Sequence, residues 1–231
     1  MPTPSNYTVG RRLFESYANL AMAEMAVHDG DAQYSKRHYM IRARLLAGLT
    51  KGTMAPRSLM LDQRIRMRLP QECIYCGAVD NLSIDHVIAT DRGGMDSGDN
   101  AVWACRTCNS SKGNRDLFEW WIQMRRGFPP LFVIRIYLKQ AICYCHTNGL
   151  MDRAISEVGK VPFAFEAIPV KFPAPGALIF SPSHARSQLD QQQQSRWEVL
   201  KVKEQHMAEV IREVRALTGK EDAAGSSGED R

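Results

Sequence analysis

Four cysteines, arranged as two Cys-x-x-Cys pairs, constrain this sequence more than any other feature. The first pair is Cys73 and Cys76, and the second is Cys105 and Cys108. Two such pairs suit a tetrahedral zinc ion with four thiolate ligands, which stabilises a small fold and leaves no coordination position open for chemistry. The alternatives are disulfides or a redox-active Cys-x-x-Cys. Neither a secretory signal nor a surrounding βαβ pattern is found, so we expect a structural Zn²⁺ site.

The interval between the two cysteine pairs predicts a strand, a loop and a second strand. Residues 82–88 alternate between apolar and polar side chains, and residues 101–104 are suited to return as the partner strand. Residues 91–98 supply the glycines and aspartates of a wide hairpin loop. We therefore expect an antiparallel hairpin that the cysteines hold at its base.

A helix is predicted to follow Cys108. Either Asn109 or Ser110 is able to cap its first turn, and apolar residues at helical spacing continue along it. Trp120 and Trp121 belong to this apolar set, and we expect them in the core rather than stacked on nucleic-acid bases. The expected local fold is thus strand, loop, strand and helix, pinned by zinc.

These residues resemble the HNH nuclease family, whose fold is the ββα-metal motif. The matching features are Cys-x-x-Cys, Ile-Asp-His near the end of the first strand, an asparagine after a glycine-rich loop, and Cys-x-x-Cys-Asn-x-x-Lys at the start of the helix. Asn109 stands where the family name places a final histidine, a variant that the family also uses. The resemblance implies a metal-dependent DNA endonuclease, a phosphodiester hydrolase.

The resemblance also implies a role for each site residue. His86 occupies the first-histidine position and is the expected general base, since a neutral imidazole accepts a proton near pH 7. Asp85 and Asn109 stand where the family places ligands of a catalytic divalent ion, and their hard oxygen atoms favour Mg²⁺ or Mn²⁺. Asn100 matches the middle asparagine, which supports the loop and steadies the base. Adjacent strand residues point to opposite faces, so a bulge or a strand end must bring Asp85 and His86 together.

Basic residues close to the predicted helix start are expected to contact DNA. Lys112 and Arg115 lie three residues apart and close to Asn109, where the positive end of a helix favours phosphate. Arg92 in the hairpin loop is a further candidate. Residues 11–68 add eleven basic against five acidic side chains. This excess predicts either a phosphate-contacting platform or a solvated helix face.

The fold class is expected to be mainly α-helical, with the small ββα element embedded between helical regions. Amphipathic patterns predict helices at residues 9–29, 32–49, 58–69 and 131–147. The expected divisions are a basic helical region at 1–69, the nuclease domain at 70–126, a helix plus a proline-rich extended segment or linker at 127–182, a C-terminal amphipathic helix at 183–220 and a disordered tail at 221–231.

Charge and hydropathy bear on the partners. The net charge of +5 favours a polyanion such as DNA. The longest apolar run is too short to span a bilayer, so we expect no membrane partner and a cytoplasmic protein. The C-terminal helix is expected to support a homodimer or to dock on the protein.

A second interpretation of the same residues is a non-catalytic, zinc-stabilised module that binds nucleic acid without cutting it. Under it, Asp85 and His86 are an ordinary surface pair, Asn100 is a turn residue and Asn109 is a helix cap. Loss of His86 would then change nothing in an assay of strand scission.

Overall fold

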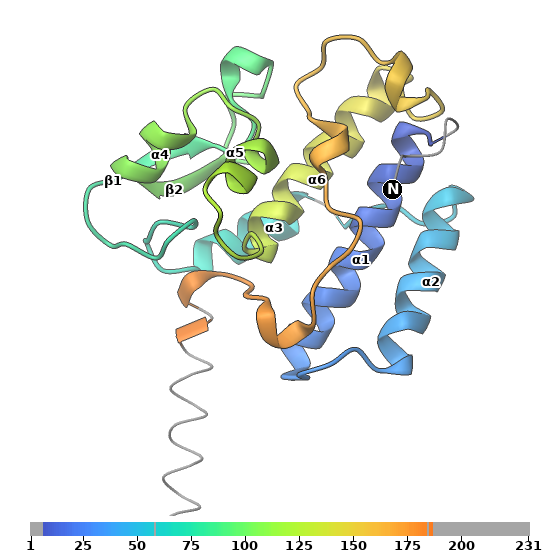
Figure 1. The fold of residues 1–231 in the computed structure, drawn as a ribbon, viewed down its shortest axis with the longest axis horizontal. Coiled ribbons are helices and arrows are strands. Elements are labelled where there is room, and N and C mark those ends of the chain that lie inside the picture. Colours follow the sequence, from blue (N-terminus) through green and yellow to red (C-terminus); the bar gives the residue numbers. More distant parts are fainter. Residues whose placement is uncertain (1–6, 58, 184, 187–231) are drawn as a thin grey trace, which may run out of the picture. The chain divides into compact units, whose positions relative to one another are not determined.

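The computed structural model describes residues 7–57, 59–183 and 185–186. A small two-stranded sheet lies among helices (Figure 1), which confirms the predicted fold class. The elements are α1 (Val9–Asp29), α2 (Lys36–Thr50), α3 (Leu59–Arg68), β1 (Leu82–His86), β2 (Ala101–Cys105), α4 (Arg106–Lys112), α5 (Leu117–Gln123) and α6 (Leu131–Thr147), with short 3-10 helices at Thr90–Arg92, Ile155–Glu157, Phe165–Ala167 and Pro175–Ala177.

The described residues from 7 to 185 form a first compact unit. Residues 187–220 of the predicted C-terminal helix, and the predicted tail at 221–231, lie outside the described residues. The description below therefore concerns the first unit. Among its described helices, none is long and apolar enough to cross a membrane.

The first two helices pack against each other. Thr8 caps α1, since its side-chain oxygen accepts a hydrogen bond from Arg11 N at 3.2 Å. Gly30 ends the helix in the left-handed conformation, with a φ of 73° that favours glycine. α2 then packs against α1, and Arg42 Nε donates to Asn19 Oδ1 at 2.6 Å.

α6 is the most deeply buried helix of the unit. All of residues 131–142 are buried, including the charged Arg135 and Lys139. Arg135 contacts Asp62 of α3 and Glu24 of α1 at 2.6 Å each, and Lys139 contacts Asp62 as well. Because a buried charge without a partner is costly, these ion pairs fix how α1, α3 and α6 pack together.

The proline-rich residues 162–182 run along α1 instead of forming a free linker. Ser16 Oγ donates to Pro169 O at 2.7 Å, and Asn19 Nδ2 donates to Val170 O at 3.0 Å. The carbonyl groups of this extended segment thus find donors on the helix. Of the two alternatives in the sequence, packing on the helical region is the one observed.

The predicted hairpin is present. β1 and β2 pair antiparallel in unbroken register, from Leu82 opposite Cys105 to His86 opposite Ala101. Ile74 N, in the loop before β1, donates to the main chain of β2 at 2.9 Å. This bond holds the first cysteine pair against the second strand.

The single helix predicted after Cys108 is wrong at its start. α4 already begins at Arg106, with Cys105 as its N-cap. Cys108 N donates to Cys105 Sγ at 3.5 Å, so a sulfur atom caps this helix. Neither Asn109 nor Ser110 has the capping position that the sequence suggested.

The predicted helix is also interrupted. Gly113, with a φ of 50°, ends α4, and Asp116 caps a separate helix, α5, by accepting a hydrogen bond from Phe118 N at 2.9 Å. Trp120 and Trp121 on α5 are 0% and 6% exposed. Their predicted place in the core is confirmed.

Candidate active site

The four cysteines come together from three neighbouring segments. Cys73 and Cys76 lie in the loop before β1, Cys105 ends β2, and Cys108 lies in α4. Their sulfur atoms all lie within 4.8 Å of one another, and the Sγ atoms of Cys76 and Cys105 are 3.7 Å apart. That distance suits two corners of a tetrahedron with Zn–S bonds of about 2.3 Å and is far longer than a disulfide of about 2.05 Å. The predicted cluster is therefore confirmed as a possible zinc site.

Asp85 lies on the buried face of β1, between the hairpin and the helices. Its side chain is 6% exposed and both carboxylate oxygens are engaged. Tyr75 OH donates to Oδ2 at 2.5 Å, and Lys112 Nζ donates to Oδ1 at 3.0 Å. Burial, reinforced by the Asp85 charge, raises the pKa of Tyr75 well above its usual value, so the phenol remains a donor.

His86 is the last residue of β1 and points to the other face of the strand. Its side chain is 26% exposed, and its Nε2 lies 3.0 Å from Asp96 Oδ1 in the hairpin loop. The unbroken strand register contains no bulge between Asp85 and His86. The strand end, the second of the two expected arrangements, is what allows both residues to line one cavity.

The two asparagines have different environments. Asn109 on α4 donates through Nδ2 to Ser83 Oγ at 3.0 Å and to Ile84 O at 3.2 Å, so Oδ1 is the atom of this amide that could coordinate a cation. Asn100 is fully buried: it accepts from Ile88 N at 2.9 Å and donates to the carbonyl groups of Ile88 and Met95 at 2.8 and 2.9 Å. Asn100 thus holds the hairpin loop closed and makes no direct contact with a reacting group.

A polar cavity of about 160 Å³ lies between β1 and α4. Asp85, His86 and Asn109 line it together with Thr90 and Asn114. A cavity of this size admits several water molecules or a phosphate group. Asp85 from the buried face, His86 from the strand end and Asn109 from the helix therefore meet in one place, although the chain separates them by two elements.

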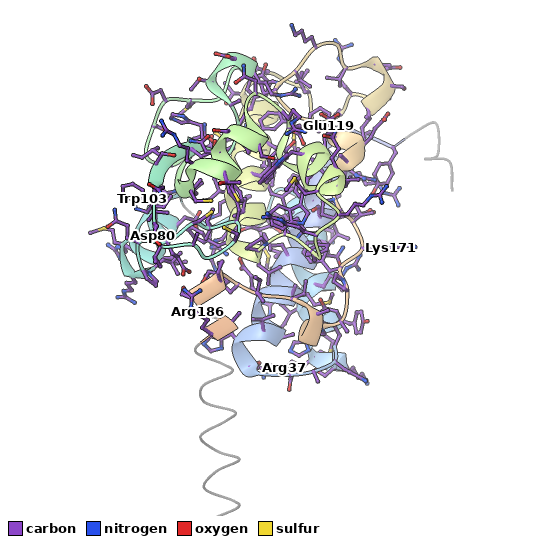
Figure 2. The ribbon with its side chains drawn as sticks, turned by 60° about the vertical axis from the view of Figure 1, so that its left-hand side comes forward. Arg37, Asp80, Trp103, Glu119, Lys171 and Arg186 are labelled. Atoms are coloured by element: carbon purple, nitrogen blue, oxygen red, sulfur yellow. The ribbon has the colours of Figure 1, made fainter. Side chains whose placement is uncertain are left out.

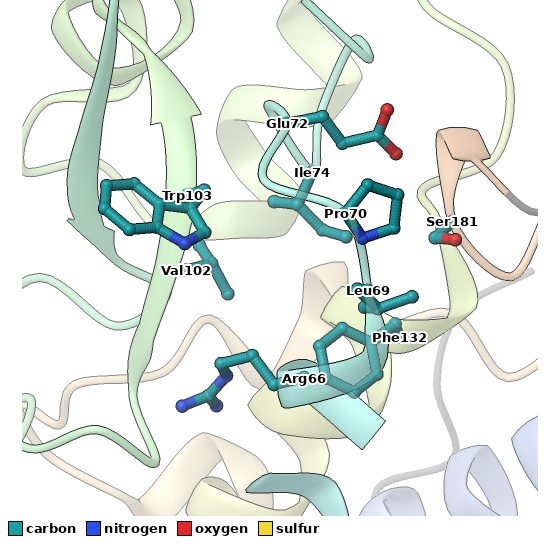
Figure 3. A pocket seen from close by; sticks show the side chains of 9 residues that line it. All are labelled: Arg66, Leu69, Pro70, Glu72, Ile74, Val102, Trp103, Phe132 and Ser181. Carbon is teal, nitrogen blue, oxygen red and sulfur yellow. The ribbon is translucent and has the colours of Figure 1, made fainter. Parts of the chain in front are cut away.

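A second, mostly apolar pocket lies beside β2 (Figure 3). Its volume is about 20 Å³, roughly enough for one water molecule. Trp103 and Val102 border it on one side and Phe132 on another. Trp103 is 36% exposed and lies at the left-hand margin of the molecule in Figure 2. The polar cavity is accordingly the candidate active site.

Comparison with known proteins agrees with the geometry. Residues 73–115 match the family model described as HNH endonuclease. This segment therefore resembles the HNH domain in sequence. No curated protein and no solved structure matches the chain. The match indicates a nuclease or nucleic-acid-binding function, and it covers the cysteine cluster and every residue of the polar cavity.

The HNH family implies a catalytic divalent cation, and the atoms of the cavity fit one. Asp85 accepts one hydrogen bond on each carboxylate oxygen, so each oxygen keeps further lone-pair capacity. Asn109 offers its Oδ1 from the facing helix. Carboxylate and amide oxygens are the ligands that Mg²⁺ or Mn²⁺ takes, and outer hydrogen bonds such as those from Tyr75 and Lys112 usually hold such carboxylates.

The three basic residues predicted to contact DNA lie in different environments. Lys112, which was expected to contact phosphate, has a fully buried side chain that forms an ion pair with Asp85. Its Nζ also donates a hydrogen bond to His86 O at 2.6 Å. Arg92 donates to Pro162 O at 3.1 Å and is half-buried. Arg115 is exposed, and its guanidinium reaches Lys112 O and a neighbouring glutamine side chain. Arg115 is thus the best placed of the three for a phosphate.

Sequence reasoning missed three residues of this region. Tyr75 and Asp96 contact the two candidate catalytic side chains, and Arg126 NH1 donates to Cys108 Sγ at 3.7 Å. Tyr75 had a usable signal, since it lies between Cys73 and Cys76. The contacts of Asp96 and Arg126 depend on loop geometry for which the sequence carries no marker.

Proposed function

We propose that this protein is a metal-dependent HNH endonuclease that hydrolyses phosphodiester bonds in DNA. The observation that supports this most is the polar cavity, where Asp85, His86 and Asn109 face a common space. Phosphodiester hydrolysis needs a base for the attacking water and a cation for the phosphate oxygens. Asn109 also follows Cys108 directly, so a structural Zn²⁺ on the cysteines would hold one wall of the cavity in place.

His86 is the proposed general base. A carboxylate accepts hydrogen bonds, so the 3.0 Å contact with Asp96 assigns the hydrogen to Nε2 and the free lone pair to Nδ1. The imidazole takes a proton from water as the water oxygen bonds to phosphorus and the P–O3′ bond breaks. A solvent water protonates the departing O3′, which gives a 5′-phosphate and a 3′-hydroxyl, and the imidazolium returns its proton to the hydroxide that remains. Asp96 stabilises the imidazolium that forms.

The remaining residues hold and orient. Asp85 and Asn109 are the proposed ligands of Mg²⁺ or Mn²⁺, which supplies positive charge to the phosphate and the departing oxygen when bound. Asn100 fixes the main chain at Ile88 and Met95, and thereby the loop that carries Asp96. Arg115 and the basic N-terminal helices are the proposed contacts to the DNA backbone.

The test is cleavage of supercoiled plasmid by the wild type and by His86→Ala. Each protein is assayed with Mg²⁺, with Mn²⁺ and with EDTA, and its zinc content is measured. We expect cleavage only with added metal, and a loss of about 10²- to 10⁴-fold in His86→Ala at unchanged zinc content, as removal of a general base predicts.

His146→Ala is the matched control, because His146 is exposed at the end of α6, outside the HNH domain. It should cleave like the wild type. Ligation of the nicked product without prior phosphorylation checks for the 5′-phosphate. Cleavage by His86→Ala at the wild-type rate would contradict the role assigned to this histidine.

One observation favours the non-catalytic binding module as a second candidate. Asp85 is buried and already engaged on both oxygens by Tyr75 and Lys112. A module of this kind would bind DNA, retain zinc and cut nothing with either metal. Plasmid cleavage separates the two functions directly, and a gel-shift assay on the same samples confirms that the protein binds.

A further inference from the structure

Tyr75 belongs to two sites at once. It lies inside the first Cys-x-x-Cys, between Cys73 and Cys76, so the geometry of the cysteine cluster sets the path of its main chain. Its hydroxyl group, in contrast, donates to Asp85, the candidate cation ligand, at 2.5 Å. Tyr75 does not line the polar cavity itself, so it can act on the cavity only through Asp85.

The position of the Tyr75 ring is tightly fixed. Its side chain is buried, and its ring packs edge-on against Trp120 with ring centres 5.0 Å apart. Cys73 N donates to Ala78 O at 2.7 Å and so closes the loop around it. A phenol held in this way has one direction in which its O–H can point, and that direction is the Asp85 carboxylate.

The two oxygens of Asp85 are thus held from different elements. Tyr75 OH fixes Oδ2 from the cysteine loop, and Lys112 Nζ fixes Oδ1 from α4. Two donors on two oxygens define the plane of the carboxylate, whereas one donor leaves it free to rotate about its last bond. The orientation of the remaining lone pairs toward the cavity therefore depends on both contacts.

We propose that Tyr75 is a positioning residue that couples the four-cysteine cluster to the candidate cation site by orienting Asp85. The inference rests on the proposed function, since it concerns the affinity of the same cavity for its cation. Outer partners of metal ligands usually contribute 10- to 100-fold to metal affinity. Removal of the Tyr75 hydroxyl should then weaken Mn²⁺ binding about tenfold, while the ring, its packing and the cysteine cluster stay in place.

The experiment is a titration of the zinc-loaded, full-length protein with Mn²⁺, followed by electron paramagnetic resonance of the free ion. The dissociation constant of interest is that of the Mn²⁺ site that is lost in the Asp85→Asn variant. Tyr75→Phe is compared with the wild type, and each titration gives a dissociation constant and a stoichiometry. A partly misfolded sample lowers the stoichiometry, whereas loss of positioning raises the dissociation constant.

Tyr137→Phe is the matched control. Tyr137 is also buried, and its hydroxyl also donates to a carboxylate at 2.5 Å, that of Asp116, which caps α5 and lines neither cavity. The two variants lose the same group from the same kind of environment. We expect Tyr137→Phe to bind Mn²⁺ within about twofold of the wild type, far from the effect expected at an outer partner of a metal ligand.

The outcomes separate this inference from the proposed function. A Tyr75→Phe constant about ten times that of the wild type, at equal zinc content and stoichiometry, supports the coupling. Equal constants in the two proteins overturn the coupling and leave the endonuclease proposal intact. If the wild type binds no Mn²⁺ at a site that needs Asp85, both the coupling by Tyr75 and the proposed metal-dependent function are overturned.

Discussion

Replacement of Lys112 by methionine tests whether this lysine contacts phosphate, as the sequence predicts, or stabilises the fold through its buried ion pair with Asp85. Lys112 Nζ lies 3.0 Å from Asp85 Oδ1, with the lysine side chain 0% and the aspartate side chain 6% exposed. Methionine keeps an unbranched apolar stem of similar length and removes the charge and its donors. Asp85 then remains buried without its ion pair, and His86 O loses its 2.6 Å donor.

The expected cost is large for a single substitution. Two unit charges 3 Å apart attract by about 5 kcal/mol at an effective dielectric constant of 20. Breaking a buried pair by removing one partner costs about 3–5 kcal/mol, because the other charge stays uncompensated. For a protein of this size each kcal/mol lowers the Tm by about 2–4 °C, so the Tm should fall by about 6–20 °C.

The assay is urea denaturation of the zinc-loaded wild type, Lys112→Met, Asp85→Asn and the double variant. Because the double variant leaves neither charge unpaired, its free energy of unfolding should exceed the value predicted from adding the two single losses by about 2 kcal/mol or more. A destabilisation of Lys112→Met below about 1 kcal/mol would refute the reasoning. If, in addition, the variant had a DNA-binding salt slope smaller by about one unit, Lys112 would be the phosphate contact that the sequence suggested.

Four further outcomes follow from the structure. Asn100→Ala should lower the free energy of unfolding by about 3 kcal/mol, because it removes both side-chain partners of the buried Ile88 main chain and the donor to the Met95 carbonyl; urea denaturation measures this. Burial raises the pKa of Cys145 to about 12, so iodoacetamide at pH 8 should modify exposed Cys143 and spare Cys145, as mass spectrometry of the native protein would show. Because this folded-state pKa is raised, the stability that the neutral thiol contributes is complete below the ordinary thiol value and should be lost as pH rises toward 12. Finally, a zinc chelator should unfold the segment that carries the four cysteines in one cooperative transition, and Mg²⁺ should not restore the fold. Circular dichroism measures this loss of secondary structure.

Local patterns in the sequence predicted the helices well where the stop signals are local. α6 is bounded by Pro130 and by Asn148, and its predicted and observed limits coincide. The limits of α1 were also predicted, since Thr8 and Gly30 flank a clear apolar stripe. The interruption between α4 and α5 was missed, although Asp116 three residues before a glutamate is a usable N-cap signal.

The site was predicted in its residue types more than in its contacts. The spacing of the two Cys-x-x-Cys pairs was enough to predict that the four cysteines lie together, because four thiolates in such pairs are typical of one metal site. The burial of Lys112 was not predictable from a helix-start pattern, since its partner Asp85 is 27 positions away on the strand. Which face of β1 a charged residue takes depends on what packs over the hairpin, and the local sequence does not encode that.

The Asp116 contacts decide whether residues 70–126 could be transferred to another protein by themselves. Its Oδ2 accepts hydrogen bonds from Tyr137 OH of α6 at 2.5 Å and from the main chain at residue 164 at 3.2 Å, while Oδ1 caps α5. A gene fusion that transplanted residues 70–126 alone would carry this carboxylate without two of its donors. Transfer of the ββα element to another protein would therefore require α6 and the chain near residue 164, where the 3-10 helix Phe165–Ala167 begins, to be transferred with it.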